Sequence, residues 1–369
     1  MSEAAHQNWA KAMGSQIDFY NHSNRKTRTD EDLDWGWYYR SMPLKRKIGL
    51  YLRPLLQIIY KKKYLALEFK KHWFIQNTEA LFRVRSTFHD DLSGKEFDSF
   101  LLSAICGFER FYYSRIHFDE IISITKEAPF TEDLPKEYMR LPLKEFTVGL
   151  KNSEIPEITI ISAKEEIDIT NNYKRYLTHR EGTSYVPGKG DVVFDCGSCI
   201  GEISAVFAAF VGTTGQVHLF DPIPLHNKYS QLQIERNPSL ASVIVINEVG
   251  VSDTSRKAVG TVSDVTTISP GGCSIDDFSL VSIDDYVRDN AISRLDYIKM
   301  DIEGAEIDAL IGATESIKKF KPKLTISCYH KASHLWEIPE LILKINPEYK
   351  LHFEQHLPFE CDAIVYATM

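Results

Sequence analysis

The stretch VVFDCGSCIGEIS, from Val192 to Ser204, decides the fold because an apolar strand runs into a turn with two glycines and then into an apolar helix. Gly197 and Gly201 let the backbone approach a bound group without interference from a Cβ atom. The helix that follows points its positive end at the same turn. This pattern is typical of a nucleotide-type pocket. Its spacing, Asp195-x-Gly197-x-x-x-Gly201, differs from the G-x-G-x-x-G of dinucleotide-binding proteins, so the ligand need not be NAD.

Beyond this turn, predicted strands and helices alternate along the chain. Such alternation indicates a parallel sheet with right-handed crossovers. The predicted strands are residues 191–195, 217–221, 243–247, 297–301 and 323–328, and the predicted helices begin near 201 and 224 and cover 283–287, 304–319 and 337–345. Residues 248–290 are less regular, apart from the helix around 283–287.

Two further strands, 350–353 and 362–368, end the chain, and the loop between them is too short for a parallel crossover. They are therefore predicted to be antiparallel. Five parallel strands closed by a hairpin fit the α/β, Rossmann-like, seven-stranded sheet of the class I S-adenosylmethionine (SAM) methyltransferases. They fit poorly a nicotinamide dehydrogenase, the alternative enzyme class, because its second half needs another crossover helix.

The N-terminal part is predicted to be separate from this sheet. Residues 1–40 are predicted to be a polar arm, 41–150 a helical accessory domain and 155–369 the methyltransferase domain, with short strands at 158–161 and 167–169. Residues 48–69 show the apolar spacing of an amphipathic helix. Nine Lys or Arg residues lie between 44 and 72 against one acid, Glu68, so this segment could lie on an anionic membrane surface or meet a phosphorylated substrate. The alternative is a core-packed helix with a solvated basic face.

Composition limits the functions to consider. A formal net charge of −8 argues against general nucleic-acid binding. No run reaches the roughly 18 apolar residues of a spanning helix, and the first residues are polar, so we expect a cytoplasmic protein. The six cysteines are irregularly spaced and are predicted to be reduced thiols; Cys196-x-x-Cys199 lacks a second pair and is interpreted as small residues beside a ligand.

Over about residues 185–369 the sequence resembles the FkbM family of SAM-dependent O-methyltransferases. The stretches that carry the resemblance are residues 193–202, 220–222, 283–286, 298–306 and 327–331, of which the run Lys299-x-Asp301-x-Glu303-Gly304-x-Glu306 is the most specific. The sequence departs from the family pattern at Ser198, Cys199 and Asp221, and at 354–356, which is less basic.

The resemblance implies SAM as cofactor and S-adenosylhomocysteine as product. Asp195 is predicted to bind the methionyl ammonium or to orient the turn, and Asp221 to bind the ribose hydroxyls. Asp253 could reach the adenine amino group, although a simple turn acid is an equal alternative. The predicted cofactor-binding residues are Asp195, Gly197, Cys199, Gly201, Asp221 and Asp253.

Methyl transfer to a hydroxyl requires in-line alignment of the acceptor oxygen and removal of its proton. Asp301 and His330 are predicted to follow neighbouring strands at the edge where open α/β sheets bind ligands. His330 is the predicted base, and Asp301 and Glu303 would position the acceptor, orient that base or coordinate a divalent ion. Whether a metal binds is left open. Glu306 is equally consistent with complementing a helix dipole, and His334, His352 and His356 receive no role.

The predicted function is O-methylation of a hydroxyl, on a sugar of a polysaccharide or glycolipid or in a nucleotide-sugar pathway. Two alternatives are O-methylation of a small natural product and a non-catalytic SAM-binding tethering protein that docks through residues 44–72. The expected partner is a sugar or small-molecule acceptor, with no nucleic acid. Peripheral membrane contact and a homo-oligomer are further expectations.

Overall fold

The computed structural model describes residues 3–22, 62–106, 120–138, 141–180, 182–261, 274–357 and 362–369. The chain divides into two compact units. Residues 1–114 with 353–363 form the first, which we call the helical unit, and residues 115–352 with 364–369 form the second, the sheet unit. Each is described by itself.

The helical unit packs three helices, α1 (Glu3–His22), α4 (Lys62–Arg85) and α5 (Asp91–Cys106), against one another. Trp9 of α1 lies against Phe74 and Phe82 of α4, at ring-centroid distances of 5.9 and 5.4 Å. Its Nε1–H donates to Asp98 Oδ1 of α5 at 3.0 Å. The same carboxylate accepts two hydrogen bonds from Arg85, at 2.7 and 2.8 Å, so one acid joins all three helices.

The predicted polar arm over 1–40 is wrong for residues 3–22, which form α1. Trp9, Met13 and Ile17 are spaced four residues apart and so lie on one helix face, where Met13 and Ile17 are buried. Residues 23–61, which include most of the predicted basic helix over 48–69, lie outside the described residues.

The predicted helical domain over 41–150 is wrong beyond residue 120. There the sheet unit begins with a four-stranded antiparallel sheet: β1 (Ile122–Pro129), β2 (Glu137–Tyr138), β3 (Leu141–Leu150) and β4 (Glu157–Ala163). Alternating Phe146, Val148 and Leu150 are buried in a core shared with α7, which explains the strand. The predicted strand at 167–169 is also wrong, because these residues lie in α6 (Lys164–Tyr173).

A seven-stranded sheet forms the centre of the sheet unit, as predicted. Its order is β15-β16-β14-β13-β7-β8-β9, and the four pairings from β14 through β9 are parallel, whereas β16 runs antiparallel to β14. The strands are β7 (Val192–Cys196), β8 (Gln216–Phe220), β9 (Ile244–Asn247), β13 (Tyr297–Met300), β14 (Lys323–Ser327), β15 (Lys350–Gln355) and β16 (Ala363–Thr368). The predicted Rossmann-like fold with a closing antiparallel strand is therefore confirmed.

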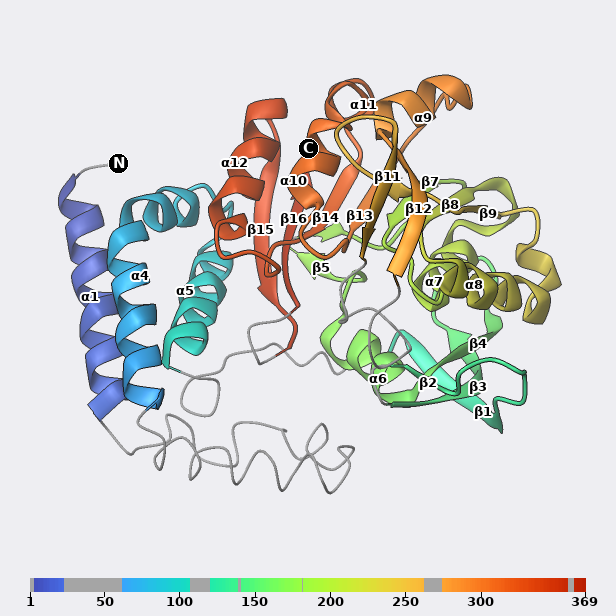
Figure 1. The fold of residues 1–369 in the computed structure, drawn as a ribbon, viewed down its shortest axis with the longest axis horizontal. Helices are drawn as coiled ribbons and strands as arrows, with labels where there is room; N and C mark the ends of the chain where they lie inside the picture. The colour runs from blue at the N-terminus through green and yellow to red at the C-terminus, as the bar shows by residue number, and fades with distance from the viewer. Residues whose placement is uncertain are drawn as a thin grey trace. The chain divides into compact units, whose positions relative to one another are not determined.

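Helix α7 (Glu202–Val211) is apolar on all sides because both faces are covered. All ten of its residues are buried, and it contacts β8 of the central sheet and β4 of the antiparallel sheet. The next helix, α8 (Pro224–Arg236), also contacts β4, and Figure 1 shows both helices beside the antiparallel strands. The small elements β5 (His179–Arg180), β6 (Thr183–Ser184), η1 (Gly212–Thr214) and η2 (Pro238–Leu240) connect the larger ones.

The predicted helix over 304–319 is two helices, α10 (Glu306–Ile311) and α11 (Thr314–Phe320). Gly312 separates them at a point where the chain touches another loop: a Cβ atom there would lie 2.1 Å from the Ser252 carbonyl oxygen. Helices α9 (Ile283–Asp289) and α12 (His334–Ile345) confirm their predictions within a few residues.

Residues 248–290 hold a small sheet that the sequence did not predict. Strand β12 (Ser274–Val281) pairs parallel with β10 (Gly250–Val251) and antiparallel with β11 (Arg256–Thr261). Among the helices within the described ranges, none combines the length and the apolar character needed to cross a membrane.

Candidate active site

The candidate site lies at the carboxyl edge of three neighbouring parallel strands. Met300 at the end of β13 pairs with Cys196 of β7 on one side and with Ile326 of β14 on the other. The loops that begin at Gly197 and Asp301 and the residues after β14 therefore meet at one edge, where open α/β sheets bind ligands. The prediction that Asp301 and His330 come together is confirmed.

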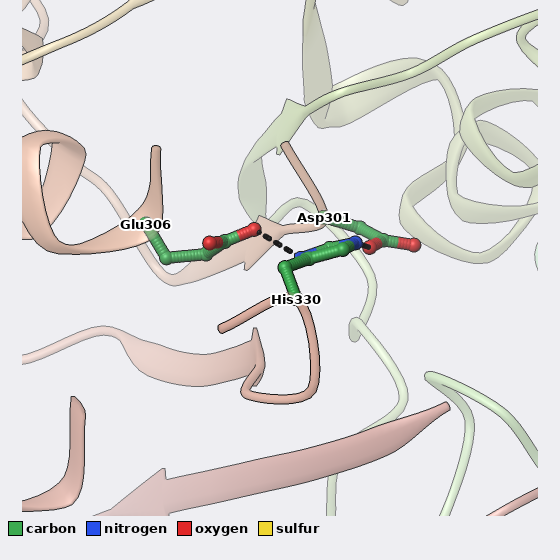
Figure 2. Close-up of side chains that lie close together, drawn as sticks. All are labelled: Asp301, Glu306 and His330. Carbon is green, nitrogen blue, oxygen red and sulfur yellow. Dashed lines mark hydrogen bonds and ion pairs between the residues drawn. The ribbon is translucent and has the colours of Figure 1, made fainter. Parts of the chain in front are cut away.

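His330 lies between two carboxylates, as Figure 2 shows. Its Nδ1 is 2.8 Å from Glu306 Oε1, and its Nε2 is 3.4 Å from Asp301 Oδ1 and 3.6 Å from Glu303 Oε2. Because an ionised carboxylate only accepts hydrogen bonds, Nδ1 carries a proton. The side chain is 7% exposed, and the buried Nε2 atom has no hydrogen-bond partner within the described ranges.

Glu306 is the fully buried anchor of this group. Its Oε1 also accepts hydrogen bonds from the backbone N–H groups of Ile302 and Gly304, at 3.0 and 3.3 Å, and its Oε2 lies 3.2 Å from His334 Nδ1. Burial raises the pKa of this carboxyl, but the hydrogen bonds from His330 and His334 outweigh burial and hold the pKa well below the ordinary value. Glu306 is therefore ionised and faces two imidazoles.

The pKa of His330 is changed in the opposite sense. Burial lowers it, but the hydrogen bond to Glu306 and the charges of Asp301, Glu306 and Glu303 outweigh burial and raise the pKa to about 9. Without ligands the imidazole is therefore mostly protonated at neutral pH. A general base works best with a pKa near the operating pH, so this environment disfavours the predicted role of proton acceptor.

Asp301 is held in place by two tyrosines. Tyr176 OH donates to its Oδ2 at 2.6 Å, and Tyr329 OH donates to its Oδ1 at 3.3 Å. Burial raises the pKa of Asp301, whereas the charges of Lys299 and His330 and the Tyr176 hydrogen bond lower it, and the net pKa is below the ordinary value. The carboxylate is thus ionised and oriented.

A strained turn places the third carboxylate. Glu303 has φ +56°, in the left-handed region that residues with a Cβ atom rarely adopt, and Gly304 follows with φ +98°. A Cβ atom on Gly304 would lie 3.0 Å from Lys331 Cε. The Glu303 side chain is 30% exposed, and burial followed by the charge of Asp301 raises its pKa. This carboxylate therefore faces His330 from the solvent side.

Beneath the turn, Lys299 of β13 and Asp195 of β7 form a buried ion pair. Lys299 Nζ is 2.9 Å from Asp195 Oδ1 and donates to the Gly197 carbonyl at 2.7 Å, while Ser204 Oγ donates to Asp195 Oδ2 at 2.5 Å. The two charged side chains are 5% and 0% exposed. Burial lowers the pKa of Lys299, but the charge of Asp195 outweighs burial and raises it. This ion pair links β7 to β13.

Most backbone N–H groups of the glycine turn, residues 197–201, donate hydrogen bonds within the protein. Gly197 N–H donates to the Phe220 carbonyl at 2.9 Å, Cys199 N–H to Asp221 Oδ2 at 3.0 Å, and Gly201 N–H to the Ser198 carbonyl at 2.8 Å. The sequence predicted that these N–H groups would meet a ligand, and for these three the structure corrects that expectation. Glycine is required at position 197 for a different reason, because a Cβ atom there would lie 1.9 Å from the Asp301 carbonyl oxygen. Glycine thus lets the two loops touch.

The comparison with protein families agrees with this geometry. Residues 195–356 match the model of the methyltransferase FkbM domain. The chain carries an FkbM methyltransferase domain. The match begins at Asp195 and includes the glycine turn, the strained turn and His330. A comparison with curated proteins found no match.

A solved methyltransferase structure has a similar fold. The methyltransferase FkbM of Methylobacillus flagellatus KT is 22% identical, covers 80% of this chain and 59% of its own, and superposes with a TM-score of 0.52. The chain thus spans about three fifths of that protein's length. Two fibrillarins are more distant. That of Methanococcus jannaschii is 13% identical, covers 68% of this chain and 98% of its own, and has a TM-score of 0.36. That of Aeropyrum pernix is 11% identical, covers 67% of this chain and 99% of its own, and has a TM-score of 0.34.

The three carboxylates predicted to bind the cofactor fall into two groups within the FkbM domain. The carboxylates of Asp195 and Asp221 are buried and already bonded: Asp221 accepts from Ile223 N–H at 2.9 Å and lies 3.0 Å from His226 Nδ1. Asp253 lies at the surface with Arg256, 2.6 Å away. Each carboxylate thus already has a partner within the protein. The predicted contacts with the ammonium, the ribose and the adenine of SAM stay predictions.

Several residues of the FkbM domain's site were not predicted. Tyr176 offered no signal, because it lies 125 residues before Asp301 in the chain. His334 received no role, although its spacing of four residues from His330 was a visible signal. Cys199, a predicted cofactor residue, is partly exposed with its thiol 3.9 Å from His226 Nε2, whereas Cys196 is buried; both are free thiols.

Proposed function

We propose that the protein is a SAM-dependent O-methyltransferase that methylates a hydroxyl group, on a sugar of a polysaccharide or glycolipid or in a nucleotide-sugar pathway. The FkbM domain over 195–356 supports methyl transfer. The observation that carries the proposal is the cluster of Asp301, Glu303 and His330 beside the glycine turn, at the carboxyl edge of β7, β13 and β14.

Unpaired polar atoms beside the glycine turn fit SAM, which carries an ammonium, a carboxylate and two ribose hydroxyls. Ser198 Oγ and Glu202 Oε2 are buried and have no hydrogen-bond partner among the residues that the structure describes. Burial, and then the charge of Glu166, raise the pKa of Glu202 to about 7, against the lowering effect of the charges of Arg175 and Lys299. Ser198 and Glu202 would hold polar groups of the cofactor. When bound, SAM supplies an electrophilic methyl group.

The chain's own residues then have to orient the acceptor and handle its proton. Asp301, fixed by Tyr176 and Tyr329, can accept a hydrogen bond from an acceptor hydroxyl and hold it in line. His330 has one ring nitrogen available, Nε2, because Glu306 holds Nδ1. The roles of proton acceptor and metal ligand therefore compete for the same atom.

The sugar acceptor rests on the family resemblance, and the cytoplasmic location rests on composition. The two alternatives predict different results with SAM. A small natural product as acceptor would still give a methylated product, whereas a non-catalytic tethering protein would bind SAM without turnover. Membrane contact through residues 44–72 and a homo-oligomer remain separate proposals.

Calorimetric titration of the full chain with SAM tests the cofactor, and mass spectrometry after incubation with SAM and cell extract searches for products heavier by one methylene group. We expect binding and a methylated product, and loss of the product in the double variant Asp301→Ala, His330→Ala. Asp308→Asn, on the exposed side of α10, is the control and should stay active. Absence of SAM binding would refute the proposal, whereas binding without turnover would favour the tethering protein.

A further inference from the structure

We propose that His330 Nε2, Asp301 and Glu303 bind a divalent cation of the Mn²⁺ type, oriented by Glu306. Cation binding stands on the geometry of these residues alone, and its use in activating an acceptor rests on the proposed function.

The donors are already gathered. Asp301 Oδ1 and Glu303 Oε2 lie 3.4 and 3.6 Å from His330 Nε2, and Glu306 Oε1 lies 2.8 Å from Nδ1 of the same ring. Asp301, Glu306 and His330 also form a group whose potential ligand atoms lie within 4.8 Å of one another. Figure 2 shows the imidazole with its two nitrogens turned toward Glu306 and Asp301. Three carboxylates that converge on one imidazole provide the negative charge that a divalent cation requires.

The atom that points to a ligand is His330 Nε2. It belongs to a side chain that is 7% exposed, and it is buried without a hydrogen-bond partner in the part of the chain that the structure describes. It lies 3.4 Å from Asp301 Oδ1 and 3.6 Å from Glu303 Oε2. Neighbouring ligands of a metal ion with bonds of about 2.1 Å are separated by roughly 3.0–3.5 Å, so these spacings suit a shared ion better than a hydrogen bond.

Glu306 completes the arrangement without being a ligand. Its Oε1 accepts from Ile302 N–H, Gly304 N–H and His330 Nδ1, and its Oε2 faces His334. A carboxylate that accepts the second ring N–H of a metal-binding histidine fixes its tautomer and aims the other nitrogen at the ion. Glu306 is therefore a positioning residue.

The hydrogen bonds to Asp301 agree with a ligand role. Tyr176 OH donates to Oδ2 at 2.6 Å and Tyr329 OH to Oδ1 at 3.3 Å, and carboxylates that bind metals are commonly held by such donors. One imidazole with two carboxylates favours Mn²⁺ over Mg²⁺ or Ca²⁺, which prefer oxygen ligands alone. Beside the proposed acceptor position, such a cation would act as a Lewis acid and lower the pKa of the acceptor hydroxyl.

Binding of Mn²⁺ to the full chain, stripped of metal with a chelator and dialysed, tests the site. The electron paramagnetic resonance signal of free Mn²⁺ falls on binding and gives the affinity without an activity assay. We expect one Mn²⁺ per chain, bound more tightly than Mg²⁺ or Ca²⁺ in competition. Glu306→Gln should lower the affinity about 10–100-fold, and Asp301→Asn and His330→Gln at least as much.

Glu303→Gln keeps the test decisive if variants of the buried residues do not fold, because this side chain reaches solvent. It should weaken Mn²⁺ binding, whereas the control Asp308→Asn, which removes an equal charge from the exposed side of α10, should not. Failure of the wild-type chain to bind millimolar Mn²⁺ would overturn the proposal. Wild-type affinity for Mn²⁺ in both Glu303→Gln and Asp301→Asn would also overturn it, as would tighter binding of Mg²⁺ than of Mn²⁺.

Calorimetry with SAM on the metal-free chain separates this proposal from the proposed function. If SAM binds but Mn²⁺ does not, the metal site fails and the methyltransferase proposal stands. If Mn²⁺ binds and depends on Glu303 but SAM does not bind, the metal site stands and the proposed function fails.

Discussion

Replacement of Lys299 by Met should destabilise the sheet unit strongly because it leaves Asp195 buried without its cation. Lys299 Nζ and Asp195 Oδ1 are 2.9 Å apart, and the side chains are 5% and 0% exposed. At an effective dielectric constant of about 20 their attraction is roughly 6 kcal/mol. Met also avoids the cost of burying the ammonium, so we expect a net loss of about 3–5 kcal/mol in the free energy of unfolding.

The double variant Asp195→Asn, Lys299→Met provides the matched comparison. With both charges removed, no uncompensated ion is left in the core, so the double variant should be more stable than the sum of the two single changes predicts.

The suitable assay is urea denaturation with hydrogen exchange of peptides from β7 and β13 as the readout. The chain has two compact units, so an unfolding signal from the whole chain need not be two-state. A loss below about 1 kcal/mol for Lys299→Met, or additive effects in the double variant, would refute the reasoning. Either result would mean that water or another group compensates Asp195.

Three other perturbations test the fold and the site. Burial lowers the pKa of His218 to about 4 from an unfolded value of 6.5, so the contribution of neutral His218 to the free energy of unfolding is complete above pH 6.5 and is lost as the pH falls toward 4. His218→Gln should therefore remove about 3 kcal/mol of the acid sensitivity of that free energy, measured by urea titrations at several pH values. An unchanged pH profile would contradict this prediction. Gly197→Ala places a Cβ atom 1.9 Å from the Asp301 carbonyl oxygen and should lower methyl transfer by about 100-fold, whereas Gly182→Ala, at φ +82° with open space, is the control for backbone strain alone. Gly312→Ala should lower the melting temperature, because the contact of its Cβ atom at 2.1 Å outweighs the usual gain of about 1 kcal/mol for Gly→Ala in a helix; a raised melting temperature would show that the loop moves freely.

The sequence predicted those parts of the protein that local patterns encode. Alternating apolar strands and amphipathic helices have their own periods, so the order of β7 to β14, the closing antiparallel strand and the glycine turn could be recognised. The neighbouring positions of Asp301 and His330 followed from strand order, because carboxyl ends of parallel strands share one edge. Residues 120–150 were misassigned because Pro129, Pro135 and Pro142 interrupt the sequence pattern, and the pairing of β3 with β1 and β4 leaves no local signal.

Only the tertiary structure decided what each polar group binds. Asp195 pairs with Lys299 because the register of β7 against β13 sets them side by side, and Tyr176 reaches Asp301 across 125 residues of chain. Glu306 could be interpreted from sequence as an acid at a helix start, but the packing of α10 beside the residues after β14 turned it toward His330. Local sequence determines which elements form, whereas partners far apart in the chain depend on register and packing, which no local pattern contains.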